Sequence, residues 1–328
     1  SLKEKEAGKE KIGTTKRGIG PLYTDHVARV GLKLWHMLNP EILREKIEKN
    51  IAEKKELLLN KDQRMVKEIF SDNNLQQFYS EQNIFNVDEI VQAYQKYAER
   101  FRSMITDTDD YLRAFLGKKK ILIEGAQGLL LDVDEGSYPK VTSSNTSVRG
   151  LANGVGLSEK DVDKTFGITK AFYMTRVGSG PFPTELGGLK GREWCEGESK
   201  EKEKEYNPGI NTKDEFRKGI AIRLAGGEYG ATTGRPRRTG WLDLPLLRHA
   251  VDINGPEVIL TKIDVLSECD EIKICVSYQY QGPGRDLGTS RLKEGDTITK
   301  AYPDADILEH CSPVYSSFSG WKEEITGI

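Results

Sequence analysis

Residues 258–264 read VILTKID, a short apolar run that ends in a polar loop, and this pattern decides the fold class. It recurs at 121–128, which read ILIEGAQG, and at 166–181, where the apolar run ends in GSGP. Residues 272–280 are a further strand candidate, and 241–253 have the pattern of a helix. Strands that alternate with helices predict an α/β fold with a mostly parallel central sheet flanked by helices, with ligands at the carboxyl ends of the strands.

The composition predicts a soluble globular protein. The 328 residues are 37% hydrophobic and include 49 basic and 51 acidic side chains. This balance gives no bias toward nucleic acid or membrane, so any basic site has to be local. The four cysteines show no CxxC or zinc spacing, which predicts reduced thiols, and no apolar run is long enough to cross a bilayer. We therefore expect a cytoplasmic protein without a nucleic-acid or membrane partner.

Two segments interrupt the alternation of strands and helices. Residues 40–117 are rich in Glu, Lys, Leu and Ile at helical spacing and predict a helical insertion, with the apolar side chains of 90–105 facing its core. Residues 186–211 have mixed charge without an apolar period and predict a flexible charged surface loop. We expect 1–328 to form a single α/β domain, and the charged start without an initiator Met predicts that this domain is truncated.

A glycine-rich basic loop reads GATTGRPRRTG at residues 230–240. It has three arginines and no large apolar side chain that would draw it into a core. Arginine forks bind carboxylates or phosphates, and glycine lets backbone N–H groups approach an anion closely. The loop therefore predicts an anion site, and the alternative is an exposed basic turn.

Two further loops have related compositions. Residues 11–21, KIGTTKRGIGP, again combine threonines, cations and glycines. Residues 141–147, VTSSNTS, offer hydroxyl and amide groups that suit phosphate oxygens. A hydroxyl-rich turn that caps a helix is the alternative for this second loop.

The loop that follows the run at 258–260 carries TKID, which looks like the guanine-reading motif of GTP-binding proteins, whose usual form begins with Asn. An aspartate can accept hydrogen bonds from both N1–H and the 2-amino group of guanine, whereas adenine offers no such pair. The alternative is a strand that ends in a charged turn.

Several longer motifs occur in one order along the chain. They are IGTT at 12–15 with GIGP at 18–21, EGAQG at 124–128, YP at 138–139, VTSSN at 141–145, TRVG at 175–178, GPFPTE at 180–185, the 230–240 loop with WLD at 241–243, and TKIDVL at 261–266. Together they resemble the adenylosuccinate synthetase family, in the family's order, from about residue 11 to 321. Chance similarity does not produce long motifs in the right order.

The resemblance implies a fold related to P-loop NTPases and a ligase that joins L-aspartate to IMP with GTP, through 6-phosphoryl-IMP and with Mg²⁺. It implies IMP contacts from Thr15, Arg29, Gln127, Thr142, Val177 and Arg235. It implies aspartate contacts from Ala231, Thr232, Thr233, Gly234, Arg235, Pro236 and Arg237. It implies GTP contacts from Arg237, Lys262, Ile263 and Asp264. Arg29 is expected to reach the neighbouring subunit's site, which implies a homodimer.

The family's amino-terminal phosphate loop, with its catalytic aspartate, and its later histidine have no counterpart in the 328 residues. We therefore expect no catalytic residue and no metal ligand in this chain, and Mg²⁺ ligands in an absent amino-terminal part. The family's final segment is also absent, so we expect truncation at both ends and very low activity for this chain alone. The alternatives are a non-catalytic nucleotide-binding or dimerisation module, and another GTP-dependent phosphotransferase.

Overall fold

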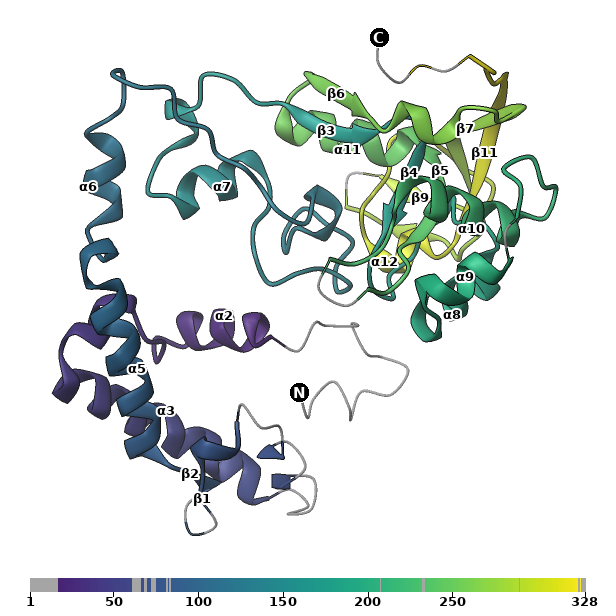
Figure 1. The fold of residues 1–328 in the computed structure, drawn as a ribbon. Helices are drawn as coiled ribbons and strands as arrows, with labels where there is room; N and C mark the ends of the chain where they lie inside the picture. The colour runs from purple at the N-terminus through teal and green to yellow at the C-terminus, as the bar shows by residue number, and fades with distance from the viewer. Residues whose placement is uncertain are drawn as a thin grey trace. The chain divides into compact units, whose positions relative to one another are not determined.

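The computed structural model describes residues 17–60, 66–67, 70–71, 75–80, 82, 84–206, 208–231, 234–288, 290–323 and 325. The chain divides into two compact units, one of which is Gly18–Ile121, while the other contains the chain from Leu122 onward (Figure 1). The single α/β domain with a helical insertion at 40–117 remains a prediction; in the structure the helical part is Gly18–Ile121. The helical segment begins earlier and is a unit of its own, because its helices bury a separate core.

The helical unit contains four helices among its described residues, with short 3₁₀ turns and one small hairpin. Their bounds are α2 (Ile19–Val27), η2 (Leu34–Leu38), α3 (Pro40–Leu59), η3 (Gln76–Phe78), β1 (Tyr79–Ser80), β2 (Ile84–Phe85), α5 (Val87–Phe101), η4 (Arg102–Met104) and α6 (Thr108–Arg113). The start of α3 follows from local chemistry. The Asn39 side chain accepts from the backbone N–H groups of Glu41 and Ile42, and Pro40 occupies the first helical position.

The core of the helical unit lies between α3 and α5. Leu43 and Ile47 of α3 pack with Val91 and Ala98 of α5. The apolar stripe predicted over 90–105 faces the core only in part. Its aromatic members Tyr94 and Tyr97 are exposed and pack edge-on against each other, and Phe101 and Met104 are also exposed. The smaller side chains fill the core because they fit between the two closely packed helices.

The second unit is built on a five-stranded sheet. Its strands are β4 (Tyr173–Arg176), β5 (Arg238–Asp243), β7 (Glu271–Tyr280), β10 (Thr297–Ile298) and β11 (Cys311–Ser319). The order is β10-β7-β5-β4, and β11 also pairs with β7. The β5–β7 pair is parallel, with Leu242 opposite Ile274, and the other pairings are antiparallel.

Two smaller sheets and a set of helices complete this unit. A separate parallel pair joins β3 (Gly167–Lys170) to β6 (Val258–Thr261), and β8 (Arg285–Asp286) pairs with β9 (Arg291–Leu292). The helices are η5 (Leu129–Leu131), α7 (Val148–Gly154), η6 (Glu159–Asp161), α8 (Gly188–Gly197), α9 (Lys200–Tyr206), α10 (Glu215–Gly226), α11 (Leu244–Asn254), η7 (Ile263–Leu266) and α12 (Ala305–Leu308).

The predicted α/β class, with parallel pairing and flanking helices, is confirmed. Within the five-stranded sheet the parallel pair is β5–β7, whereas β4–β5, β7–β10 and β7–β11 are antiparallel because β10 and β11 return along β7. The predicted mostly parallel pairing therefore does not describe this sheet. The strands predicted at 258–260 and 272–280 are present as β6 and β7. The strand predicted at 121–124 is absent, and Leu122 is 92% exposed. A β-strand needs a neighbouring strand to accept and donate its backbone hydrogen bonds, and no described strand lies beside this run.

The prediction of a loop over 186–211 is also corrected, because this segment contains α8 and α9. One face of α9 is anchored by Glu203, whose side chain is fully buried. Its carboxylate accepts from Trp194 Nε1 at 3.0 Å, from Arg223 Nε at 2.7 Å and from the Tyr229 hydroxyl at 2.7 Å. A charged segment without an apolar period thus folds onto the domain through a buried ion pair.

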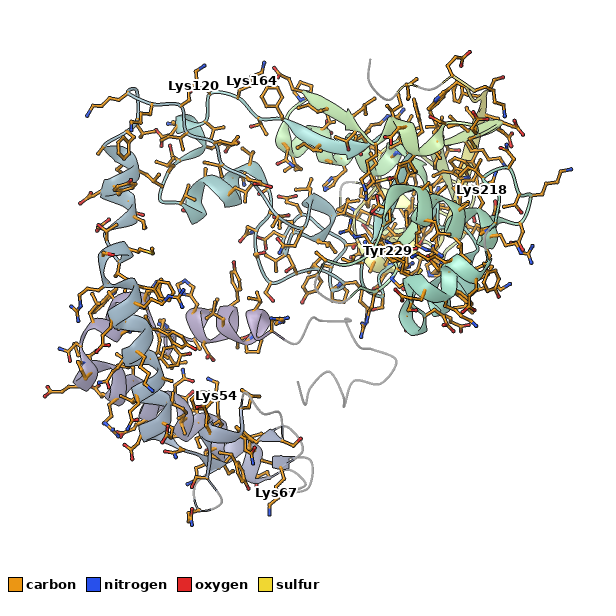
Figure 2. The ribbon with its side chains drawn as sticks, in the orientation of Figure 1. Lys54, Lys67, Lys120, Lys164, Lys218 and Tyr229 are labelled. Carbon is orange, nitrogen blue, oxygen red and sulfur yellow. The ribbon has the colours of Figure 1, made fainter. Side chains whose placement is uncertain are left out.

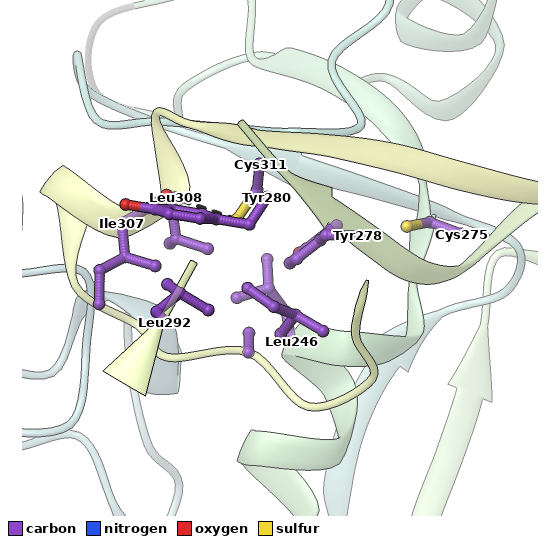
Figure 3. Close-up of a cluster of buried hydrophobic side chains, with 10 residues drawn as sticks. Leu246, Cys275, Tyr278, Tyr280, Leu292, Ile307, Leu308 and Cys311 are labelled. Atoms are coloured by element: carbon purple, nitrogen blue, oxygen red, sulfur yellow. Dashed lines mark hydrogen bonds between the residues drawn. The ribbon is translucent and has the colours of Figure 1, made fainter. Parts of the chain in front are cut away.

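Two apolar clusters hold this unit together. One contains Leu246, Tyr278, Tyr280 and Leu308 (Figure 3), and the other contains Tyr173 and Trp241 among others. All four cysteines of the chain are buried and none forms a disulfide. Within the described ranges, no helix has the length and apolar character that crossing a membrane requires.

Candidate functional site

The glycine-rich loop is closed at its base by backbone hydrogen bonds. Tyr229 and Pro236 form an isolated antiparallel bridge, and Gly230 N–H donates to the carbonyl of Arg235 at 2.8 Å. Gly234 has a φ of +66°, a left-handed conformation that glycine adopts without strain. Tyr229, labelled in Figure 2, donates its hydroxyl to Glu203 of α9 at 2.7 Å. The loop is therefore held at a defined place on the domain.

Glu228 precedes this loop and its side chain is fully buried. Its carboxylate binds Arg237 Nη1 at 3.0 Å and Lys262 Nζ at 2.9 Å. It also binds Lys170 Nζ at 3.2 Å and accepts from the Tyr173 hydroxyl at 2.8 Å. One carboxylate therefore joins the glycine-rich loop to the TKID segment, through Arg237 and Lys262, which lie 25 residues apart in the sequence.

The electrostatics of this cluster favour a bound anion. Burial alone would raise the pKa of Glu228, but the hydrogen bond from Lys262 and the charge of Lys170 hold this pKa below its ordinary value. The pKa of Lys170 is itself lowered, mainly by burial, and Glu228 opposes this effect. With Glu228 ionised, the cluster carries more positive than negative charge, so a further anion would lower its energy.

The TKID segment presents an aspartate outward. Lys262 has a φ of +54° at the turn between β6 and η7, and its Nζ also donates to the carbonyl of Gly226 at 2.6 Å. Ile263 and Asp264 are exposed. No described residue forms a hydrogen bond or ion pair with the Asp264 carboxylate, so its oxygens are available to a ligand.

A second part of the candidate site joins the loops at 125–128 and 141–147. Its centre is Asp132, whose fully buried carboxylate accepts backbone N–H groups from both sides. The donors on one side are Asp134 at 2.9 Å and Glu135 at 3.1 Å, and those on the other are Thr146 and Ser147, the latter at 2.9 Å. Burial would raise the pKa of Asp132, but these four donors lower it.

The 141–147 loop also bonds to the end of the 125–128 loop and to the residues that follow it. Thr146 Oγ1 donates to the carbonyl of Gly128 at 2.9 Å. The backbone N–H of Thr142 donates to the carbonyl of Leu131 at 2.8 Å, and that of Val133 donates to the carbonyl of Ser144 at 3.2 Å. Gln127 has a φ of +65°, so its side chain leaves the chain from a tight turn. Gln127 and Thr142 therefore lie on neighbouring loops whose backbones hold each other in place.

Two arginines, the buried Arg238 and the partly buried Arg176, position the segment that follows β4. Arg238 binds Glu185 through two hydrogen bonds and donates to the carbonyls of Gly178 and Gly180 at 2.9 and 2.6 Å. Arg176 Nη2 donates to Ser137 Oγ at 2.8 Å and to the carbonyl of Lys140 at 2.9 Å. Burial and the nearby charge of Arg238 lower the pKa of Arg176 to about 9. These contacts bring the segment at 177–180 to the 137–140 turn.

The described part of the chain has no group of three or more His, Cys, Asp or Glu side chains arranged to hold a metal ion.

The comparisons agree with the motifs. The family model described as adenylosuccinate synthetase matches residues 1–328. The chain belongs to the adenylosuccinate synthetase family. It is 40% identical over 331 residues to adenylosuccinate synthetase of Thermodesulfovibrio yellowstonii, a match that covers all of this chain and 64% of that protein. The corresponding protein of Halothermothrix orenii is also 40% identical over 330 residues, with all of this chain and 63% of that protein covered.

A solved structure is similar as well. The structure of fully ligated adenylosuccinate synthetase from Plasmodium falciparum matches with a TM-score of 0.73 and 33% identity, over 99% of this chain and 63% of that one. The chain thus spans somewhat less than two thirds of the length of the adenylosuccinate synthetases that it matches.

The structure brings together several of the residues that the adenylosuccinate synthetase resemblance predicted. Arg237 and Lys262 meet at Glu228, and the loops that carry Gln127 and Thr142 are bonded to each other through Thr146 and Gly128. Ala231, Gly234, Arg235 and Pro236 lie in the closed loop, and Val177 follows β4. Thr15, Thr232 and Thr233 lie outside the described residues. Arg29 belongs to the helical unit, where it follows α2 with a φ of +64°.

Sequence reasoning missed Glu228, Lys170 and Asp132. Lys170 ends β3 opposite Thr261, the residue before Lys262, so its place at the end of the predicted strand was a usable signal. Glu228 carried no such signal, because a carboxylate beside glycines is ordinarily solvated. Asp132 follows Leu129–Leu131, so its place directly after an apolar run was a usable signal.

Proposed function

We propose that the protein is a ligase that joins L-aspartate to IMP with GTP hydrolysis, giving adenylosuccinate, GDP and phosphate through 6-phosphoryl-IMP. The observation that carries the proposal is the buried Glu228 carboxylate, which holds Arg237 of the glycine-rich loop and Lys262 of the guanine-reading segment in one ion cluster. The family membership supports the same reaction. Because the cluster links the proposed aspartate loop to the proposed guanine segment, aspartate and the guanine nucleotide would bind close together.

The glycine-rich loop is proposed to bind L-aspartate. Arg235 and Arg237 would bind its two carboxylates, with Thr233 and the loop backbone as neutral donors. Ala231, Thr232, Gly234 and Pro236 complete this segment. Arg237 would also contact the GTP ribose, since its guanidinium lies beside Lys262 at Glu228.

The TKID segment is proposed to bind the guanine base. The exposed Asp264 carboxylate would accept from N1–H and the 2-amino group, and Ile263 and the Lys262 stem would cover the base. An adenine base has no pair of donors in this arrangement, so the contact selects GTP over ATP.

The joined loops around Asp132 are proposed to bind IMP. Gln127 would hydrogen-bond the purine, Thr142 and Thr15 the phosphate, and the Val177 backbone with Arg235 the ribose. Arg29 would complete the site of a second subunit in a homodimer. Phosphorylation of O6 would turn it into a good leaving group, which the aspartate amine displaces. Mg²⁺ would neutralise phosphate charge during transfer, and we assign it no ligand among the described residues.

The test is a reaction of the complete protein with IMP whose O6 is labelled with ¹⁸O. If O6 is phosphorylated and then displaced, the released phosphate carries one labelled oxygen, and adenylosuccinate and GDP form in equal amounts. Product must depend on all three substrates. Unlabelled phosphate would reject the phosphorylated intermediate, and GDP release without adenylosuccinate would reject the ligase reaction.

A further inference from the structure

The two carboxylate oxygens of Glu228 serve two different segments of the candidate site. Oε1 accepts from Lys262 Nζ at 2.9 Å, in the proposed guanine segment. Oε2 accepts from Arg237 Nη1 at 3.0 Å, in the proposed aspartate loop. The carboxylate therefore sets the distance between the two cations.

Two further side chains hold the Glu228 carboxylate in place. The Tyr173 hydroxyl donates to Oε1 at 2.8 Å, and Lys170 Nζ lies 3.2 Å from Oε2. The backbone carbonyl of Glu228 accepts from Arg237 N–H at 2.9 Å. Tyr173 and Lys170 belong to β4 and β3, so the carboxylate is held against two strands while Arg237 and Lys262 stay partly exposed. The partly exposed partners of Glu228 are Arg237 and Lys262, the residues proposed to contact aspartate and the guanine nucleotide.

We propose that Glu228 is a positioning residue that couples the aspartate site to the guanine nucleotide site. The inference rests on the proposed function. Arg237 and Lys262 each carry a positive charge and repel each other unless a negative charge lies between them. Removing the carboxylate charge would leave both cations, and Lys170, to move apart. Both binding segments would then change together.

A neighbouring carboxylate provides a matched control. Glu203 is as deeply buried as Glu228 and binds Arg223, Trp194 and Tyr229. It therefore supports the base of the glycine-rich loop through Tyr229, but it makes no contact with Lys262 or Arg237. Glu203→Gln makes the same chemical change at the same depth without touching the two cations.

The first experiment measures amide hydrogen exchange of the complete protein. Glu228→Gln is expected to raise exchange both at 229–237 and at 262–266, whereas Glu203→Gln is expected to raise it only at 229–237. Faster exchange in just one segment of Glu228→Gln, or in both segments of Glu203→Gln, would overturn the proposal. This readout does not depend on turnover.

The second experiment measures steady-state kinetics. Glu228→Gln is expected to raise KM for aspartate and KM for GTP about tenfold each, with a smaller fall in kcat and little change in KM for IMP. If Glu228 had a purely structural role, the substitution would lower the melting temperature and the fraction of active protein. It would not raise KM for aspartate and GTP while leaving KM for IMP unchanged. Equal increases of all three KM values would contradict the proposal.

A third variant covers the case in which Glu228→Gln does not fold. Lys262→Met removes one partner of the carboxylate at a partly exposed position, and Lys262 reaches the aspartate loop through Glu228. It is expected to raise KM for aspartate about threefold in addition to KM for GTP, and an unchanged KM for aspartate would overturn the proposal. If the unsubstituted protein forms no adenylosuccinate, the proposed function fails. The coupling is then still tested by amide hydrogen exchange of Lys262→Met: faster exchange at 229–237 supports it, and unchanged exchange there overturns it.

Discussion

Arg238 and Glu185 form a buried two-pronged ion pair, with Nε 2.7 Å from Oε1 and Nη2 2.5 Å from Oε2. The remaining terminal nitrogen of Arg238 donates to the carbonyls of Gly178 and Gly180. Arg238 therefore differs in role from its neighbours Arg235 and Arg237. Its guanidinium ties β5 to the segment after β4, and it is not available to a substrate.

Replacing Arg238 with Lys is expected to destabilise the protein by about 3 kcal/mol. Lysine keeps the charge but cannot make the fork to Glu185 and reach two carbonyls at once, so buried acceptors lose their donors. Urea unfolding followed by circular dichroism would measure the loss. Arg235→Lys at an exposed position is the matched control and is expected to change stability by less than about 0.5 kcal/mol. Similar values for the two variants would contradict the assigned roles.

Replacing Arg235 with Ala is expected to raise KM for aspartate about tenfold and to change KM for GTP much less. The proposed role of Arg235 is to bind an aspartate carboxylate and the IMP ribose, whereas Arg237 lies beside the guanine segment. Initial rates with each substrate varied in turn would separate the two effects. An equal loss for aspartate and GTP would mean that the loop has been assigned wrongly.

Replacing Asp264 with Asn is expected to change the preferred base from guanine to xanthine. The amide offers one acceptor and one donor, which matches N1–H and the 2-oxo group of xanthine, whereas guanine presents two donors. The ratio of kcat/KM for XTP to that for GTP should rise by at least about tenfold. Asp270→Asn, at another exposed carboxylate near the same segment, serves as the control. An unchanged ratio in Asp264→Asn would rule out Asp264 as the guanine reader.

Asp243 predicts a pH dependence of stability. Its carboxylate accepts from Tyr278 at 2.6 Å and caps α11 through Leu246 N–H, while Oδ2 is buried without a hydrogen-bond partner among the described residues. Burial raises its pKa to about 7. Between about pH 4 and pH 7 the folded protein therefore keeps a proton that the unfolded chain has lost, so this group lowers the free energy of unfolding as pH rises.

The Asp243→Asn variant lacks this titration. Relative to the unsubstituted protein, its free energy of unfolding should increase between pH 4.5 and pH 8, by about 4 kcal/mol at most. Urea unfolding of both proteins at several pH values would measure the difference, in which other titrating groups cancel. Parallel pH profiles would show that the Asp243 carboxyl does not titrate in this window.

The sequence by itself determined the α/β class, the family and the order of the loops with binding chemistry. These properties are local: a short apolar run predicts β6, and glycines with arginines predict an anion-binding loop at 230–240. Residue type and spacing along the chain suffice for them, because backbone conformation and hydrogen-bonding capacity belong to neighbouring residues.

The tertiary structure alone decided which charged residues are buried and what they join. Glu228 and Glu203 lie in stretches that resemble a solvated surface, yet each is fully buried because its partners come from other segments of the chain. The run at 121–124 shows the reverse, since its apolar sequence predicts a strand that has no described partner. Burial of a charge and pairing of a strand both depend on partners that are remote in sequence, and only the folded chain brings those partners into place.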